Sequence, residues 1–213
     1  MSGRPSSPDG APLDRGRTAR GLRDEDLPLV TDRLLLRPYR PDDEAALLAL
    51  FSDPAVVRYL YSEPMRADGV GEALARRLGP VVFAHEGDEL KLAAELRDSG
   101  AVVGELTLFH RSDQHRRGEI GYVVGPGFAG RGLATEGALA MCQVGFEIVG
   151  FHRIEAQCDA RNLASARVMD RIGMRREAHL RENEWVKGEW TDALVAALLA
   201  EEWFGGPGGS RSG

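Results

Sequence analysis

The sequence predicts an α+β fold in which helices flank a mixed, mostly antiparallel central sheet. The first observation behind this prediction is a set of apolar segments at hairpin spacing, at 90–96, 101–109 and 119–124. The second is a change of pattern after residue 124, where helices and strands alternate and a crossover connection has to bring two strands parallel. The third is a final pair of strand-like segments, at 174–180 and 190–198, which closes the sheet.

The N-terminal half of the folded region starts with a strand predicted over 33–38. A helix then begins at the PDDE segment, 41–44, because proline fits the first helical turn and acidic side chains suit the positive end of a helix. Asp53 precedes a proline and ends this helix, since a residue before proline avoids the helical conformation. A second helix is predicted over 70–78, and residues 81–84 fit either a strand or the end of a helix.

The hairpin segments come next, and a tight turn at 98–100 joins the first two. A polar loop is predicted over 110–117. Residues 133–149 are apolar almost all round, which predicts a buried helix. A strand over 153–158 and a helix over 163–172, with apolar residues at helical spacing, complete the alternating region.

Charge and composition restrict the function classes. The chain has 33 acidic and 27 basic residues and a net charge of −6, which disfavours broad electrostatic binding to DNA or RNA. No apolar run approaches the roughly 18–20 residues that a membrane span needs. Cys142 and Cys158 form no disulfide framework, so we expect a reduced, cytoplasmic location. The histidines show no metal-ligand spacing, and we expect no metal site.

The two ends of the chain differ from its middle. Residues 1–26 combine prolines, glycines and arginines with only three large apolar residues, and residues 205–213 read GGPGGSRSG. Such segments bury too little apolar surface to offset the loss of chain entropy. We therefore expect a disordered N-terminal tail over 1–26, one folded domain over 27–204 and a flexible C-terminal tail over 205–213.

The most informative stretch is EIGYVVGPGFAGRGLATEG, residues 119–137, in which a strand enters a glycine-rich turn and a helix follows. Glycines let the backbone approach a ligand and adopt positive φ, and a helix start presents unpaired N–H groups at its positive end. The stretch therefore predicts an anion site, to which Arg131 adds a charge. A Walker loop is excluded because no lysine follows the glycines. A dinucleotide fingerprint over 125–130, a pyrophosphate loop for coenzyme A and a plain strand-to-helix turn are the alternatives.

Two motifs then point to one family. The segment GRGLA at 130–134 resembles the acyl-CoA loop of the GNAT acetyltransferases, and NLAS at 162–165 begins a helix that resembles the second motif of that family. The segments TDRLLLRP at 31–38 and GEWTD at 188–192 are similar to its RimJ/RimL branch. The resemblance covers about residues 27–203. It implies a GNAT-like sheet that is splayed near the acyl-CoA loop.

The resemblance also implies which residues bind acetyl-CoA, the acetyl donor. The strand before the loop would line the pantetheine arm and polarise the thioester carbonyl. The loop and the helix start would hold the pyrophosphate through N–H groups, although Ala129 stands where the family usually has Gln or Arg and provides no such side chain. Asn162 would hold a pantetheine amide, cap its helix, or both. The expected cofactor-binding residues are Tyr122, Val123, Val124, Ala129, Gly130, Arg131, Gly132, Leu133, Ala134, Thr135, Asn162 and Ser165.

Three residues are candidates for the chemistry of acetyl transfer, in which the amine loses a proton and the leaving thiolate gains one. The resemblance implies Ser165 as the proton donor, although a serine in a first helical turn equally fits bonding to the local backbone. Glu184 lies in a segment similar to the one that carries the proposed base of RimL-like enzymes. Glu119 lies where several GNAT enzymes place a base that acts through water. Each carboxylate also fits a solvated or salt-bridged surface acid, and we favour Glu184 as the base.

The resulting prediction is an acetyl-CoA-dependent N-acetyltransferase in which a primary amine attacks the donor directly in a ternary complex. From the resemblance we favour a protein N-terminus as the acceptor. The alternatives are acetylation of a small amine, such as an aminoglycoside, a polyamine or an amino acid, and a non-catalytic acyl-CoA sensor. Arg58, Tyr59 and Tyr61 are candidates to wall the acceptor site. The expected partners are acetyl-CoA, the amine and, in a homodimer, a second copy of the chain, with neither nucleic acid nor membrane.

Overall fold

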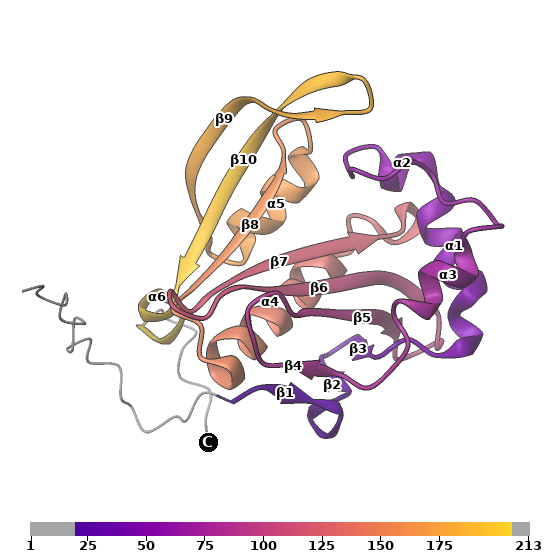
Figure 1. Cartoon of the computed structure of the whole chain (residues 1–213), viewed down its shortest axis with the longest axis horizontal. Coiled ribbons are helices and arrows are strands. Elements are labelled where there is room, and N and C mark those ends of the chain that lie inside the picture. Colours follow the sequence, from indigo (N-terminus) through magenta and orange to yellow (C-terminus); the bar gives the residue numbers. More distant parts are fainter. Residues whose placement is uncertain (1–19, 206–213) are drawn as a thin grey trace, which may run out of the picture.

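The computed structural model describes residues 20–205, and its centre is an eight-stranded sheet (Figure 1). The strand order is β2-β3-β5-β6-β7-β8-β10-β9. Among the described strands, each neighbouring pair of this sheet is antiparallel except β7–β8, which is parallel. The predicted α+β fold with a mixed, mostly antiparallel sheet is therefore confirmed. The strands are β2 (Leu29–Val30), β3 (Leu34–Arg37), β5 (Glu89–Leu96), β6 (Val102–Ser112), β7 (Arg117–Val124), β8 (Arg153–Asp159), β9 (Arg175–Val186) and β10 (Glu189–Leu199).

Helices cover both faces of this sheet, because side chains alternate between its faces and both sets are apolar in the central strands. On one face, α1 (Glu44–Ser52) and α3 (Val70–Ala75) pack in a cluster that includes Ala93 and Val123. On the other, α4 (Leu133–Gln143) and α5 (Leu163–Arg171) pack in a larger cluster with Leu106. The remaining elements are η1 (Asp24–Asp26), η2 (Pro41–Asp43), α2 (Pro54–Val57), η3 (Pro126–Phe128), η4 (Val144–Val149) and α6 (Ala200–Gly205).

The parallel pair β7–β8 is interrupted, and this interruption positions the candidate site. The two strands pair only over residues 117–119 and 153–155. Beyond that point, β7 pairs with β6 alone up to Val124, while β8 pairs with β10 up to Asp159. The strands diverge in Figure 1, and we call the unpaired edges of 120–124 and 156–159 the splay. The splay expected from the family resemblance is therefore present.

Several predicted boundaries are wrong. The final hairpin is longer than expected, because β9 continues through the polar segment 181–186. The polar loop predicted over 110–117 shrinks to 113–116, since β6 and β7 extend into it as a hairpin. The helix over 133–149 is α-helical only to Gln143 and continues as the π-helical turn η4. Residues 82–83 form a strand, which resolves the ambiguity at that point.

The predicted tail boundaries also need correction. Leu22 is fully buried and lies in β1 (Leu22–Arg23), which pairs with β4 (Val82–Phe83), so residues 20–26 belong to the folded domain. Burial of Leu22 is the physical reason that this segment is ordered. Gly205 is the last residue of α6 rather than part of a tail. The rest of the two predicted tails, 1–19 and 206–213, lies outside the described residues. Within 20–205, no helix is long and apolar enough to cross a membrane.

Candidate active site

The glycine-rich turn forms the start of α4, as its composition predicts. Gly130 and Gly132 have φ angles of 75° and 79°, in the left-handed region that favours glycine, and Gly132 caps the helix. The first turn of a helix leaves N–H groups without intrahelical partners, and the dipole makes this end positive. Residues 133–135 therefore present backbone donors at the end of the loop. Arg131 is exposed, and its guanidinium lies 5.7 Å from the centroid of the Phe128 ring.

A contact that the sequence did not reveal fixes this loop to the N-terminal strand region. Glu136, in the first turn of α4, accepts hydrogen bonds from the Thr31 hydroxyl at 2.6 Å and from the Arg33 amide at 2.7 Å. The Arg33 guanidinium bonds the other carboxylate oxygen at 2.7 Å and the Arg131 carbonyl at 2.7 Å. Partial burial raises the pKa of Glu136, but the hydrogen bonds from Thr31 and Arg33 outweigh it and hold this pKa below its usual value. The carboxylate is therefore charged at neutral pH.

Tyr122 and Ser165 meet on the α4 and α5 side of the splay. The Tyr122 hydroxyl lies 2.9 Å from Ser165 Oγ and donates to the Ser165 carbonyl at 3.0 Å. Burial raises the pKa of Tyr122, so the phenol stays protonated at neutral pH. Asn162 caps α5 by accepting a bond from the Ser165 amide at 3.1 Å. Ser165 is thus oriented by both neighbours, and its hydroxyl is not the cap of its own helix.

Val123 of β7 lies against Gly104 of β6. Its carbonyl oxygen lies 2.3 Å from the position that a Cβ on Gly104 would occupy. Gly104 pairs with Val124 in the sheet, so the absent side chain is what lets the two backbones come together. The position of the β7 residues expected to contact the donor therefore depends on Gly104.

Replacing Gly104 by alanine is expected to lower the melting temperature by about 2–10 °C, because overpacking of this kind costs about 1–3 kcal/mol. The clash is with backbone atoms, which cannot turn aside. Affinity for acetyl-CoA should fall in the same variant, since Val123 has to move. Gly71→Ala is the matched control, because a Cβ at Gly71 meets nothing within 4 Å. Differential scanning fluorimetry of both variants, with and without CoA, measures the two effects; equal melting temperatures would contradict the role of Gly104.

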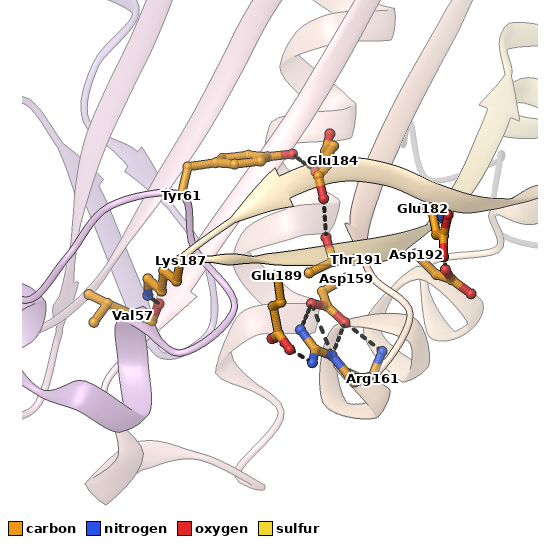
Figure 2. Close-up of polar contacts among 10 residues, drawn as sticks. All are labelled: Val57, Tyr61, Asp159, Arg161, Glu182, Glu184, Lys187, Glu189, Thr191 and Asp192. Carbon is orange, nitrogen blue, oxygen red and sulfur yellow. Dashed lines mark hydrogen bonds and ion pairs between the residues drawn. The ribbon is translucent and has the colours of Figure 1, made fainter.

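Glu184 lies on the other side of the sheet, inside β9 rather than in a loop (Figure 2). One of its carboxylate oxygens accepts a bond from the Tyr61 hydroxyl at 2.6 Å, and the other accepts from the Gln157 amide at 2.7 Å. Partial burial of the Tyr61 hydroxyl, the bond to Glu184 and the charge of Glu119 all raise the pKa of Tyr61. Tyr61 therefore stays a donor at neutral pH. The bond places Tyr61 beside the predicted base, and its role in the wall of the acceptor site stays a prediction.

Glu119, the second candidate base, has a different environment. Its carboxylate forms an ion pair with Arg111 at 2.8 Å. The Arg111 guanidinium lies 4.3 Å from the centroid of the Phe109 ring. Glu119 pairs with Glu155 at the last register position before the splay. The structure thus places Glu119 at the base of the splay but ties its charge to a neighbouring cation.

The end of the β9–β10 hairpin reaches across to α2. The Lys187 ammonium donates to the Val57 carbonyl at 2.5 Å, and Figure 2 shows both residues beside the Tyr61 contact. Two segments more than a hundred residues apart therefore meet on the open side of the splay. Arg58 stacks over Tyr59 at 5.1 Å in the same region, but neither contacts a carboxylate among the interactions of the described residues.

The structure brings the sequence-predicted residues together in two groups. Tyr122, Asn162 and Ser165 form one group with the glycine loop on the α4 side, and Glu119 and Glu184 lie on the opposite face. Sequence reasoning missed Thr31, Arg33 and Glu136, although the first two lie in a segment noted for its resemblance to the RimJ/RimL branch. It also missed Gln157. Within residues 20–205, no group of three histidine, cysteine or acidic side chains is arranged to hold a metal ion.

Comparison with known proteins identifies the family. Residues 33–175 match the acetyltransferase (GNAT) domain. The chain belongs to the GNAT acetyltransferases. Among GNAT relatives, the uncharacterized N-acetyltransferase YnaD of Bacillus subtilis is 32% identical over 176 residues, which cover 82% of this chain and 98% of YnaD. The matched residues 33–175 include the splay and the glycine loop, and they end at the start of β9.

Two further similar proteins carry more informative names. The putative ribosomal N-acetyltransferase YdaF of Bacillus subtilis is 26% identical over 180 residues, covering 83% of this chain and 96% of YdaF. The crystal structure of spermidine N-acetyltransferase from Vibrio cholerae, in complex with CoA and spermine, superposes with a TM-score of 0.69 at 20% identity. It covers 82% of this chain and 99% of that structure, and this likeness shows the shared fold.

Proposed function

We propose that this GNAT enzyme transfers an acetyl group from acetyl-CoA to a primary amine by direct attack in a ternary complex. The observation that carries the proposal is the splay itself, because it brings the glycine loop at the start of α4, the Tyr122–Ser165 pair and the Glu184 carboxylate around one break in the sheet. The relative crystallised with CoA shares this fold, which supports the choice of donor. A dinucleotide site is disfavoured because antiparallel strands precede the loop.

The donor site uses mainly backbone groups. Residues 130–135 offer helix-start and loop N–H groups to the pyrophosphate, and the free edge of β7 at 122–124 offers backbone partners to the pantetheine amides. A β7 N–H on this edge is the proposed donor to the oxyanion of the tetrahedral intermediate. Ala129 has no polar side chain and its N–H bonds the Pro126 carbonyl, so Arg131 is the cationic side chain of the loop itself.

The reaction requires two proton transfers. The amine nitrogen forms a bond to the thioester carbonyl carbon, and its proton passes to Glu184. The carbon–sulfur bond then breaks, and the thiolate takes a proton from Ser165 Oγ, which Tyr122 orients; Ser165 regains a proton from solvent, to which Glu184 releases the proton of the amine. Glu184 suits the role of general base better than Glu119. Its oxygens accept hydrogen bonds from neutral donors, whereas Glu119 forms an ion pair with Arg111. No cationic side chain in the described part of the chain pairs with Glu184, so its carboxylate also attracts the positive charge of a protonated amine.

A protein N-terminus is the acceptor we propose. The RimJ/RimL-like segments and the similarity to YdaF support it. A polyamine is the second candidate, because a relative with the same fold is crystallised with spermine. The test is a screen of peptides with different N-terminal residues, polyamines and aminoglycosides, with release of CoA thiol as the readout. Turnover of peptides supports the first acceptor, and turnover of polyamines alone supports the second. Tight acetyl-CoA binding without turnover on any amine would support a sensor instead.

Ser165→Ala is expected to lower kcat by about 10- to 100-fold while changing KM for acetyl-CoA by less, because the hydroxyl acts when the thiolate leaves. The helix should stay intact, since Asn162 bonds the Ser165 backbone amide rather than its side chain. Steady-state kinetics on the best acceptor from the screen measure both constants. Asn162→Ala is the control that removes the cap and keeps the hydroxyl. A rise in KM without loss of kcat would assign Ser165 to binding.

A further inference from the structure

Glu136 is a charged carboxylate placed beside the proposed phosphate site. It lies in the first turn of α4, and its side chain is 16% exposed. A negative charge is favourable at a helix N-terminus, but it also repels a second anion that binds there. If acetyl-CoA binds at this helix start, its pyrophosphate and Glu136 compete for the same positive field. The charge of Glu136 therefore has to be compensated.

Arg33 supplies that compensation. Its Nη2 and Nε both lie against one Glu136 oxygen, at 2.6 and 2.7 Å, in a fork of the kind that only arginine provides. The Arg33 amide and the Thr31 hydroxyl satisfy the other oxygen. Within residues 20–205, the donors to this carboxylate come from residues 31–33, and the net charge of the Arg33–Glu136 pair is zero.

Arg33 also orients a peptide group of the loop. Its Nη1 bonds the Arg131 carbonyl, and Nη2 lies 3.5 Å from the position of a Cβ on Gly132. The carbonyl and the N–H of a trans peptide point in opposite directions. Anchoring the Arg131 carbonyl on Arg33 therefore fixes the Gly132 N–H pointing away from Arg33. The N-terminal strand region thus sets the geometry of the glycine loop as well as its charge.

We propose that Arg33 is a positioning residue for the acyl-CoA phosphates: it cancels the charge of Glu136 and holds the Arg131–Gly132 peptide in its binding orientation. This inference rests on the proposed function, since it concerns the donor site. It gives Arg33, which lies about a hundred residues before the loop, a role in the affinity for acetyl-CoA.

Two substitutions separate this role from a merely structural one. Arg33→Gln and Glu136→Gln both break the Arg33–Glu136 ion pair but leave opposite charges beside the phosphates, and Arg33→Gln also removes the bond to the Arg131 carbonyl. A structural role predicts weaker CoA binding in both. Our proposal predicts that Arg33→Gln raises the Kd of CoA about tenfold, and that Glu136→Gln lowers it about threefold. The double variant balances the charge again but lacks the bond to the Arg131 carbonyl, so its Kd should lie between those of the unsubstituted protein and Arg33→Gln.

Isothermal titration calorimetry with CoA and with 3′-dephospho-CoA measures these constants in the full chain. The two ligands share the pyrophosphate and differ only in the 3′-phosphate. If Arg33→Gln loses the same affinity for both, the loss therefore arises at the pyrophosphate. Arg97→Gln is the matched control, because Arg97 bonds the Thr31 and Asp32 carbonyls, at 2.8 and 2.9 Å, without reaching the loop. It should leave the Kd unchanged.

The outcomes are distinct. Unchanged affinity in Arg33→Gln, or weakened affinity in Glu136→Gln, overturns the inference and leaves the proposed function standing. Failure of the unsubstituted protein to bind CoA overturns the proposed function itself. If Arg33→Gln does not fold, the direction of the Glu136→Gln effect still decides, because the two explanations predict opposite signs.

Discussion

Substituting Gly132 with aspartate is expected to abolish acetyl-CoA binding, with a rise in Kd of at least about 100-fold. The position has a φ of 79° and caps α4, so any side chain is strained there, although aspartate tolerates this region better than most residues. The new carboxylate would stand at the helix start, where the pyrophosphate is proposed to bind. It would also lie close to Nη2 of Arg33 and compete with Glu136 for that guanidinium.

The control for this variant is Gly132→Asn, which has nearly the same shape and no charge. Asparagine should weaken binding through bulk alone, and the difference between the two variants reports the charge at the site. Calorimetry with CoA gives both constants, and a thermal melt of each variant checks that the fold persists. If Gly132→Asp binds CoA as tightly as the unsubstituted protein does, the assignment of the loop is refuted.

Glu184→Gln is expected to lower kcat by about 10²- to 10⁴-fold, the range typical of a lost general base. Donor affinity should not change, because Glu184 lies on the face opposite the glycine loop. Glutamine keeps one oxygen for the Tyr61 hydroxyl, so the hairpin should stay in place. Steady-state kinetics with the acceptor from the screen, together with CoA calorimetry, separate the two effects.

Glu119→Gln provides the comparison, since it removes a carboxylate that is already paired with Arg111. We expect a loss of less than about tenfold in that variant. The reverse order, with the larger loss at Glu119, would transfer the role of base to that residue. Tyr61→Phe tests the orientation of Glu184 separately, because it removes one donor and keeps the ring.

The parts of the site that could be predicted from the sequence are local ones. The glycine loop, the start of α4 and the Asn162 cap each depend on residues a few positions apart, so their spacing carries the information. The contacts that could not be predicted join distant segments. Arg33 and Glu136 are 103 residues apart, and Tyr61 and Glu184 are 123 apart. Nothing in either local pattern indicates its partner.

The errors in the fold have a similar origin. The prediction ended the first strand of the final hairpin at residue 180, because polar residues follow and apolar alternation stops. β9 nevertheless continues to Val186, since it is an edge strand whose pairing with β10 needs no buried face. At the N-terminus, a single leucine among polar residues gave no periodic signal. Leu22 is ordered by its place in the core beside Phe83, which only the tertiary structure provides.

The interrupted pairing of β7 and β8 has a consequence for the energetics of the domain. A strand edge within a sheet normally has its N–H and C=O groups satisfied by a neighbour, and unpaired edges are costly where water is excluded. In the splay that neighbour is missing, so whatever molecule lies there completes the sheet. A bound substrate then pairs with the free strand edges while it is present. Because it binds only the folded protein, its binding free energy also stabilises the fold around β7 and β8.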